Sequence, residues 1–400
     1  MLATLSSLVA LELGLSLGGA RAGMFYGQPL PPFGSITNPA QAAWLHRALA
    51  EGGDGGGISV WDTELGWVMA PGRRTEDGQE TINSAGMRGP RDYASVRPAG
   101  TLRLSAYGDS FTFGDEVADE SAYPHLLEQQ AAERGQKLEA FNFGLPGGGT
   151  DQAWLRYRRE REAWPTEVVA IGILLENIGR NVNRYRPRWT PYTTGPSVKP
   201  RFVLEDDGEL RLVPIPVYAD RSEYALAVRD GTVWRATRED DYWHDRPGLG
   251  VFQHLAIARV LGVLLAHHER QPRSLWLDSE GEAYRTSLAI LEGFHREALA
   301  DGATAAPIVL FPDADDLREL RDTGQRYWQG LVDDLEGRGI PVIDLSDALL
   351  ERSRSLEPGK DLVGVYVSRK GHLAHAGNEV VAREVLDWIE DRGLFESDPR

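Results

Sequence analysis

From residue 102 onward, short apolar runs alternate with longer amphipathic segments. The apolar runs are LRLSAY (102–107), LEAFNFG (138–144), EVVAIGIL (167–174), APIVLF (306–311) and IPVIDL (340–345). The amphipathic segments include 121–134, 150–162, 281–300 and 318–337, and a final helix whose apolar face is expected at Val381, Val385, Trp388 and Ile389. This alternation predicts an α/β fold in three layers, with a central parallel sheet between two layers of helices.

Two segments fall outside this pattern. Residues 23–99 are rich in glycine and proline, as in GQPLPPFG and EGGDGGG, and are expected to form an irregular N-terminal extension that packs on the later domain. Within that domain, 100–395, residues 184–250 are expected to be an insertion. There RFVLEDDGELRLVPIPV turns at Asp207-Gly208, which is a β-hairpin signal.

The N-terminus, residues 1–22, is mostly apolar but contains Glu12 and lacks a basic start. Ala20-Arg21-Ala22 offers the small residues of a signal cleavage site. The apolar stretch barely reaches the length of a membrane-spanning helix. We expect a signal or a membrane anchor, and hence an extracytoplasmic or membrane-associated protein. The alternatives are a buried helix and a cytoplasmic protein.

The composition excludes several classes of function. The 400 residues carry a formal net charge of −17 with no compensating basic stretch, which argues against nucleic acid as a partner. The chain has no cysteine, so it can form no disulfide, thiolate nucleophile or cysteine metal site. His372 and His375 are three residues apart but have no third ligand nearby, so no metal site is predicted.

Unusual residues stand in the loops that follow the predicted strands, where open parallel sheets bind their ligands. Ser110 in GDS (108–110) is either part of a helix cap together with Asp109 or a nucleophile. The loop GLPGGGT (144–150) fits neither a Walker motif nor a dinucleotide fingerprint, so no cofactor is predicted. It is either a tight turn or a loop whose N–H groups face a ligand oxygen. Thr112 breaks the Gly-x-Ser-x-Gly elbow of α/β-hydrolases.

Taken together, the loops resemble the four sequence blocks of the SGNH (GDSL-type) hydrolase family over about 102–388. GDS matches the first block, and NFGLPGGGTDQ matches the second with Asn142 and Gly147. LLENI keeps Asn177 of the third block, Gly-x-Asn-Asp, but lacks its glycine and aspartate. His372, five residues before a glycine, matches the last block.

This resemblance implies a mechanism and a set of site residues. In the family a serine attacks the ester carbonyl, a histidine takes its proton, and fixed N–H donors stabilise the oxyanion. The upstream segment LGWVMAPG to TINSAGMRG (65–89) is similar to that of bacterial, often membrane-anchored, members. The implied residues are Ser110 and His372 for catalysis, Ser110, Gly147 and Asn177 for the oxyanion hole, and Asp109 and Asn142 in support.

One position departs from the family pattern. Members carry an aspartate two or three residues before the histidine, where this chain has Lys370 and Arg369. In a serine protease, neutralising the corresponding aspartate lowers turnover about 10⁴-fold. The alternatives are a Ser–His dyad, orientation of His372 by a backbone carbonyl, a distant carboxylate such as Asp361 or Glu176, or a chain that is inactive as a hydrolase.

The expected function is that of an esterase or acylhydrolase acting on an acylated carbohydrate or small molecule through an acyl-enzyme. One alternative is transfer of the acyl group onto a glycan, because an acceptor alcohol can replace water in the second step. The other is a catalytically impaired carbohydrate-binding module. Three tryptophans of the insertion are candidates either for stacking on sugar rings or for simple packing: Trp189, Trp234 and Trp243.

Overall fold

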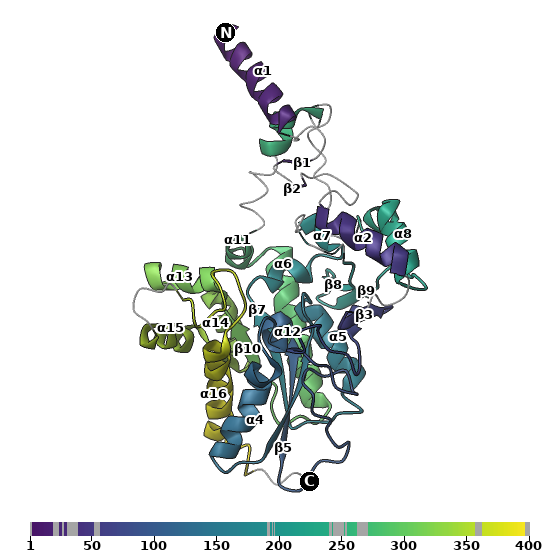
Figure 1. The fold of residues 1–400 in the computed structure, drawn as a ribbon. Coiled ribbons are helices and arrows are strands. Elements are labelled where there is room, and N and C mark those ends of the chain that lie inside the picture. Colours follow the sequence, from purple (N-terminus) through teal and green to yellow (C-terminus); the bar gives the residue numbers. More distant parts are fainter. Residues whose placement is uncertain are drawn as a thin grey trace.

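Five parallel strands form the central sheet of the computed structural model, in the order β11-β10-β7-β5-β6 (Figure 1). They are β5 (Leu102–Gly108), β6 (Leu138–Gly144), β7 (Val168–Leu174), β10 (Ile308–Phe311) and β11 (Val342–Asp344). Every residue of β5, β6 and β7 is buried, as expected for strands covered on both faces. The predicted α/β fold is confirmed, and the five predicted runs are its strands.

The structure describes most of the chain. The described residues are 2–18, 24–25, 28–29, 39–51, 57–189, 193, 195, 197–239, 242, 252, 254–261, 271–356 and 362–396.

Helices cover both faces of the sheet (Figure 1). On one face α4 (Tyr123–Glu133) packs against α16 (His375–Asp391), and on the other α5 (Thr150–Glu160) packs against α12 (Glu282–Ala300). Because β6 and β7 lie on opposite sides of β5, right-handed crossovers place α4 and α5 on opposite faces. The connection after β5 leads to β6 on one side, whereas the connection after β7 leads to β10 on the other side. Where neighbouring strands of an open parallel sheet are continued in opposite directions, ligands bind at the carboxyl ends of the strands.

Among the helices predicted from the amphipathic segments, one differs from the prediction. The single helix expected at 318–337 is two helices, α13 (Ala314–Thr323) and α14 (Gln329–Gly337). Gly324 ends α13 with φ 70°, a left-handed conformation that favours glycine and stops a helix. The predicted apolar face of α16 is buried at all four positions. The shorter helices are α3 (Ser110–Phe113), α6 (Asn177–Asn181), α7 (Arg186–Trp189), α8 (Arg221–Arg229), α9 (Thr232–Ala236), α11 (Pro272–Leu277), α15 (Ser346–Ser355) and the 3₁₀ turn Asp119–Ser121.

The N-terminal extension is more ordered than its composition predicts. It contains α2 (Pro39–Glu51), an antiparallel hairpin of β3 (Ser59–Asp62) and β4 (Gly66–Met69), and the short strands β1 (Met24–Phe25) and β2 (Gln28–Pro29). The insertion contains the predicted hairpin, β8 (Arg201–Leu204) with β9 (Leu210–Val213). Extension and insertion pack together because Trp44 and Trp61 lie against an apolar cluster of the insertion: Tyr185, Val198, Ile215, Tyr218, Tyr224, Val228 and Val233.

The first helix, α1 (Leu2–Leu17), covers most of the predicted signal or anchor. Its Glu12 accepts hydrogen bonds from the backbone N–H groups of Ala256 and Ile257. Among the described residues, no helix combines the length and the apolar character that crossing a bilayer requires.

Candidate active site

Ser110 lies in the turn that follows β5. Asp109 is the N-cap of α3, and its Oδ1 accepts a hydrogen bond from the backbone N–H of Phe111 at 2.9 Å. Ser110 is the first residue of α3; it is buried, and its Oγ lies 2.8 Å from Nε2 of His372. The sequence left open whether Ser110 is part of a helix cap or a nucleophile. In the structure Asp109 caps the helix, and Ser110 contacts the histidine.

His372 reaches the serine from the turn before α16. Its Nδ1 lies 2.7 Å from Oε2 of Glu116, and its backbone N–H donates to the same oxygen at 2.8 Å. The ring also packs against Phe111, with 5.2 Å between ring centroids. A carboxylate beside Nδ1 keeps the proton on that nitrogen and leaves Nε2 as an acceptor for the Ser110 hydroxyl. Ser110, His372 and Glu116 thus form one chain of hydrogen bonds.

Glu116 occupies a backbone conformation that non-glycine residues rarely adopt, with φ 67°. This conformation costs about 1–2 kcal/mol, and such strain is characteristic of functional sites. Desolvation raises the pKa of the carboxyl, but the hydrogen bonds from the backbone and ring of His372 outweigh it, so the pKa is lowered overall. Glu116 is therefore ionised at neutral pH and fixed on the ring.

At the position that the sequence left open, a carboxylate beside Nδ1 of His372, the structure places Glu116. Lys370 and Arg369, which stand where the family resemblance predicts an aspartate, are both exposed. Glu176, one of the two carboxylates considered, instead lies 3.2 Å from Nη2 of Arg180. The other, Asp361, lies outside the described residues.

A second carboxylate, that of Asp115, lies close to the same ring. Its Oδ2 is 3.8 Å from Nε2 of His372. Burial raises the pKa of Asp115, although the nearby His372 and Arg88 oppose the shift. Asp115 was not identified from the sequence, where no motif separates it from the chain's other 59 acidic residues.

Gly147 lies on the same cavity as Ser110 and His372. Its φ is +74°, a left-handed conformation that favours glycine. Arg186 donates to the Gly147 carbonyl at 2.8 Å, and the indole of Trp67 donates to the Pro146 carbonyl at 3.0 Å, so the peptides on both sides of Gly147 are held. Within the described part of the chain, the Gly147 N–H is paired with no acceptor.

Asn142 and Asn177 are both buried but occupy different surroundings. Asn142 donates to the carbonyl of Phe113 at 3.2 Å and accepts from the N–H of Gly144 at 3.0 Å, which ties the end of β6 to α3. Asn177 begins α6 just after β7, and among the described residues neither atom of its amide has a hydrogen-bond partner. The structure does not place Asn177 on the wall of the cavity that holds Ser110.

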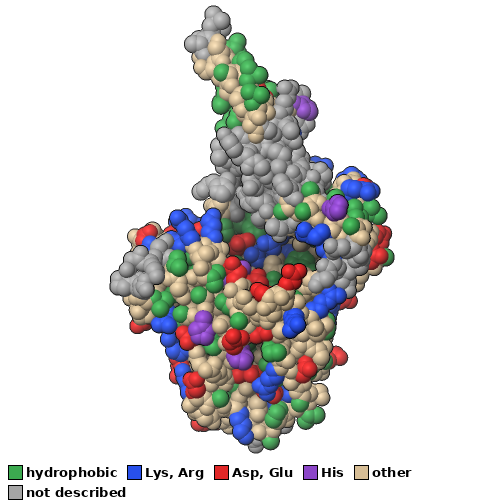
Figure 2. All heavy atoms as spheres, in the orientation of Figure 1, with side chains coloured by type: hydrophobic (Ala, Val, Ile, Leu, Met, Phe, Trp, Pro, Cys, Tyr) green, Lys and Arg blue, Asp and Glu red, His purple; other side chains and the backbone are tan. Residues whose placement is uncertain are grey.

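The active-site cavity has a volume of about 470 Å³ and carries charges of both signs. Figure 2 shows acidic and basic side chains gathered around a hollow on this face of the protein. Arg180 lies between Asp109 and Glu176, 3.2 Å from a carboxylate oxygen of each. Burial raises the pKa of Asp109 against the opposing effect of Arg180, whereas Arg180 and Arg186 outweigh desolvation at Glu176 and lower its pKa. Burial also lowers the pKa of Arg186 to about 10.

The tryptophans predicted as candidates for sugar stacking serve as packing residues where they are described. Trp189 is buried against α6, and a Cβ at Gly179 would come within 2.5 Å of its ring. Trp234 packs edge-on against Tyr185 and lies under the guanidinium of Arg188, 4.4 Å away. Trp243 lies outside the described residues.

Comparison with known proteins finds similarity among solved structures. No protein-family model and no curated protein sequence matches the chain. The lipase/acylhydrolase from Enterococcus faecalis is 14% identical over 73% of this chain and 96% of that chain, with a TM-score of 0.36. A lipolytic protein of the G-D-S-L family from Desulfitobacterium hafniense DCB-2 is 12% identical over 72% and 98%, with a TM-score of 0.33. A catalytic mutant of an acetylxylan esterase from Geobacillus stearothermophilus is 14% identical over 74% and 96%, with a TM-score of 0.38.

Proposed function

We propose that this protein is a serine-dependent esterase of the SGNH type, which hydrolyses a carboxyl ester through an acyl-serine at Ser110. The observation that carries the proposal is the hydrogen-bond chain from Ser110 through His372 to Glu116. A serine hydroxyl becomes a useful nucleophile when a base stands ready to take its proton and a third group orients that base. These three residues lie at the carboxyl ends of the strands, where open sheets bind ligands.

In the first half of the reaction, Nε2 of His372 takes the proton from Ser110 as Oγ forms a bond to the ester carbonyl carbon. The carbonyl electrons move onto oxygen and form a tetrahedral oxyanion. When the C=O bond re-forms, the ester C–O bond breaks and the alcohol leaves with the proton from Nε2. Glu116 remains ionised throughout and stabilises the imidazolium.

In the second half, water takes the place of the alcohol. His372 removes a proton from the water, whose oxygen attacks the acyl carbon, and then returns that proton to Ser110 as the carboxylic acid leaves. The N–H groups of Ser110 and Gly147 are the proposed donors to the oxyanion. The first N–H of a helix has no partner within the helix, and the hydrogen bond from Trp67 to the carbonyl of Pro146 fixes the peptide that carries the Gly147 N–H.

We expect Asn177→Ala to lower kcat by about 10²- to 10³-fold with little change in KM. The reason is that its buried amide has no hydrogen-bond partner among the described residues and would gain one, by turning toward the active-site cavity, only as negative charge develops on the substrate. Steady-state kinetics with 4-nitrophenyl acetate would measure both constants, and thermal unfolding would check that the variant is folded. A change confined to KM would assign Asn177 to substrate binding instead.

The alternative reaction is transfer of the acyl group to a glycan. It uses the same acyl-serine, and the observation that favours it is a second cavity, rich in aromatic side chains, that shares wall residues with the active site. A non-catalytic binding module would have no use for the ordered contacts between Ser110, His372 and Glu116, which favour catalysis.

Product analysis tests the proposed function. The protein is incubated with 4-nitrophenyl acetate, with and without an added oligosaccharide, and the fate of the acetyl group is followed by mass spectrometry. Hydrolysis predicts free acetate under both conditions, and transfer predicts acetylated oligosaccharide. If folded protein turns over no short-chain ester by either route, the proposal is wrong.

A further inference from the structure

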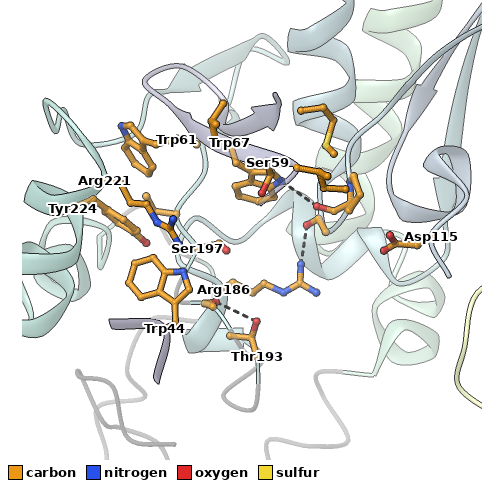
Figure 3. Close-up of a pocket in the computed structure, with 18 residues that line it drawn as sticks. Trp44, Ser59, Trp61, Trp67, Asp115, Arg186, Thr193, Ser197, Arg221 and Tyr224 are labelled. Carbon is orange, nitrogen blue, oxygen red and sulfur yellow. Dashed lines mark hydrogen bonds between the residues drawn. The ribbon is translucent and has the colours of Figure 1, made fainter. Parts of the chain in front are cut away.

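A second cavity, of about 410 Å³, adjoins the active-site cavity. We call it the aromatic cavity. The two cavities share three wall residues, Asp115, Gly147 and Arg186. In Figure 3 Asp115 lies at one end of the aromatic cavity and a group of aromatic side chains at the other, with Arg186 and Trp67 between them. A molecule bound in the aromatic cavity would therefore extend toward the catalytic residues.

The far end of the aromatic cavity is built from both the extension and the insertion. Trp61 of β3 stacks on Tyr224 of α8, with ring centroids 4.6 Å apart and planes 20° apart. Trp44 of α2 packs edge-on against Tyr224 at 5.9 Å. The guanidinium of Arg221 lies 5.6 Å from the ring of Trp44. These contacts fix the rings as a rigid aromatic wall.

Trp67 links this wall to the active site. Its indole N–H donates to the carbonyl of Pro146 at 3.0 Å, and its Cζ2 lies 3.9 Å from where a Cβ of Gly147 would be. The side chain is only partly buried, so part of its ring remains open to the cavity. A flat ligand on Trp67 would lie next to the glycine proposed to bind the oxyanion.

The hairpin that carries Trp61 and Trp67 is fixed to α5. Gln152 donates from its buried amide to the carbonyl of Leu65 at 2.7 Å, and Arg159 forms an ion pair with Asp62 at 2.8 Å. At the hairpin turn Gly66 has φ +88°, and a Cβ there would come within 2.2 Å of the carbonyl of Val198. The aromatic cavity is therefore preorganised, which reduces the entropic cost of binding.

We propose that the aromatic cavity binds a pyranose ring of the saccharide whose ester is cleaved at Ser110; its catalytic role rests on the proposed function. A sugar ring presents C–H groups on its faces and hydroxyl groups at its rim. Aromatic rings contact such faces, and the same walls carry Ser59, Ser197 and Arg186 for the rim. An acyl chain could form no hydrogen bond with the hydroxyl groups of Ser59 and Ser197, and burying polar groups without partners is unfavourable.

Binding is tested first without catalysis, in the Ser110→Ala protein. Cellotetraose, xylotetraose and tetragalacturonate are titrated by calorimetry at millimolar concentrations. We expect saturable binding of at least one of them, weakened about tenfold by Trp67→Ala and by Trp44→Ala, because each variant removes one contact face. Trp164→Ala is the matched control and should leave binding unchanged. The ring of Trp164 is also half-buried, but Trp164 comes just before β7, at the opposite end of the sheet, where it packs on Phe141.

Kinetics then connect the aromatic cavity to the reaction. In the wild-type background, Trp44→Ala, at the end of the aromatic cavity away from Asp115, should raise KM for glucose pentaacetate by about tenfold. It should leave kcat/KM for ethyl acetate, whose alcohol has no ring, unchanged. Equal losses on both esters would mean that Trp44 only supports the fold, and a selective loss on ethyl octanoate would make the cavity an acyl pocket. Either result would overturn the proposal, as would the absence of saccharide binding.

The two proposals can fail separately. Saccharide binding that depends on Trp67, in a protein that cleaves no ester, would refute the proposed function and leave the aromatic cavity as a sugar site. Ester turnover without saccharide binding would refute the sugar site and leave the proposed function standing.

Discussion

Replacing Ser110 with alanine is expected to lower kcat by about 10⁵- to 10⁶-fold, as for removal of the nucleophile from a serine protease. No other atom of the side chain can form the acyl intermediate, so only binding and the oxyanion donors remain. The variant should stay folded, because it loses one hydrogen bond of about 1 kcal/mol. The measurement is kcat on 4-nitrophenyl acetate, with thermal unfolding as the check on folding.

A second serine provides a matched control. The Oγ of Ser121 lies 2.9 Å from Nδ1 of His375, whose Nε2 lies 3.3 Å from Glu379. This arrangement copies the residue types of the proposed triad, but His375 is exposed and the active-site cavity does not include it. Ser121→Ala should therefore leave kcat unchanged. A large loss in Ser121→Ala with activity retained in Ser110→Ala would place the nucleophile at Ser121.

Replacing Glu116 with glutamine is expected to lower kcat by about 10³- to 10⁴-fold, the effect of neutralising the carboxylate of a serine protease triad. Glutamine keeps the size of the side chain but can offer its N–H₂ to Nδ1, which favours the wrong tautomer of His372 and removes the charge that stabilises the imidazolium. KM should change little, because the ground state of the substrate does not contact Glu116. Steady-state kinetics measure both constants.

Glu116→Asp and Glu120→Gln are the controls for this variant. Aspartate keeps the charge on a shorter side chain, so part of the activity should be retained. Glu120 is an exposed neighbour on the 3₁₀ turn that makes no contact with His372 among the described residues, and its replacement should have no effect. If Glu116→Gln is fully active, another group orients His372 and the assignment of Glu116 is wrong.

The fold was predictable because its strands are buried on both faces. Such strands are continuous apolar runs, and the runs at 102–107, 138–144 and 167–174 correspond closely to β5, β6 and β7. Ser110 and His372 were found because short motifs mark both, and the structure brings them to 2.8 Å across 262 residues of sequence.

Glu116 could not be found in the same way. It contacts a histidine 256 residues away, and its role depends on a backbone conformation that no local pattern of sequence indicates. It lies six residues after Ser110 in the same loop, where the resemblance to the family placed no acid. The aromatic cavity was missed for a related reason. Its rings come from α2, β3, β4 and α8, and only tertiary packing between the extension and the insertion brings them together.

The central claim, that Ser110 is an activated nucleophile, is tested most directly by covalent labelling. A fluorophosphonate reacts only with a serine whose proton is taken by a nearby base, and it needs no knowledge of the natural ester. Intact-mass measurement followed by peptide mapping should show one adduct, on Ser110, formed much more slowly in Glu116→Gln and absent from folded Ser110→Ala. An adduct on Ser121 or another serine, or no adduct on the folded wild-type protein, would contradict the account.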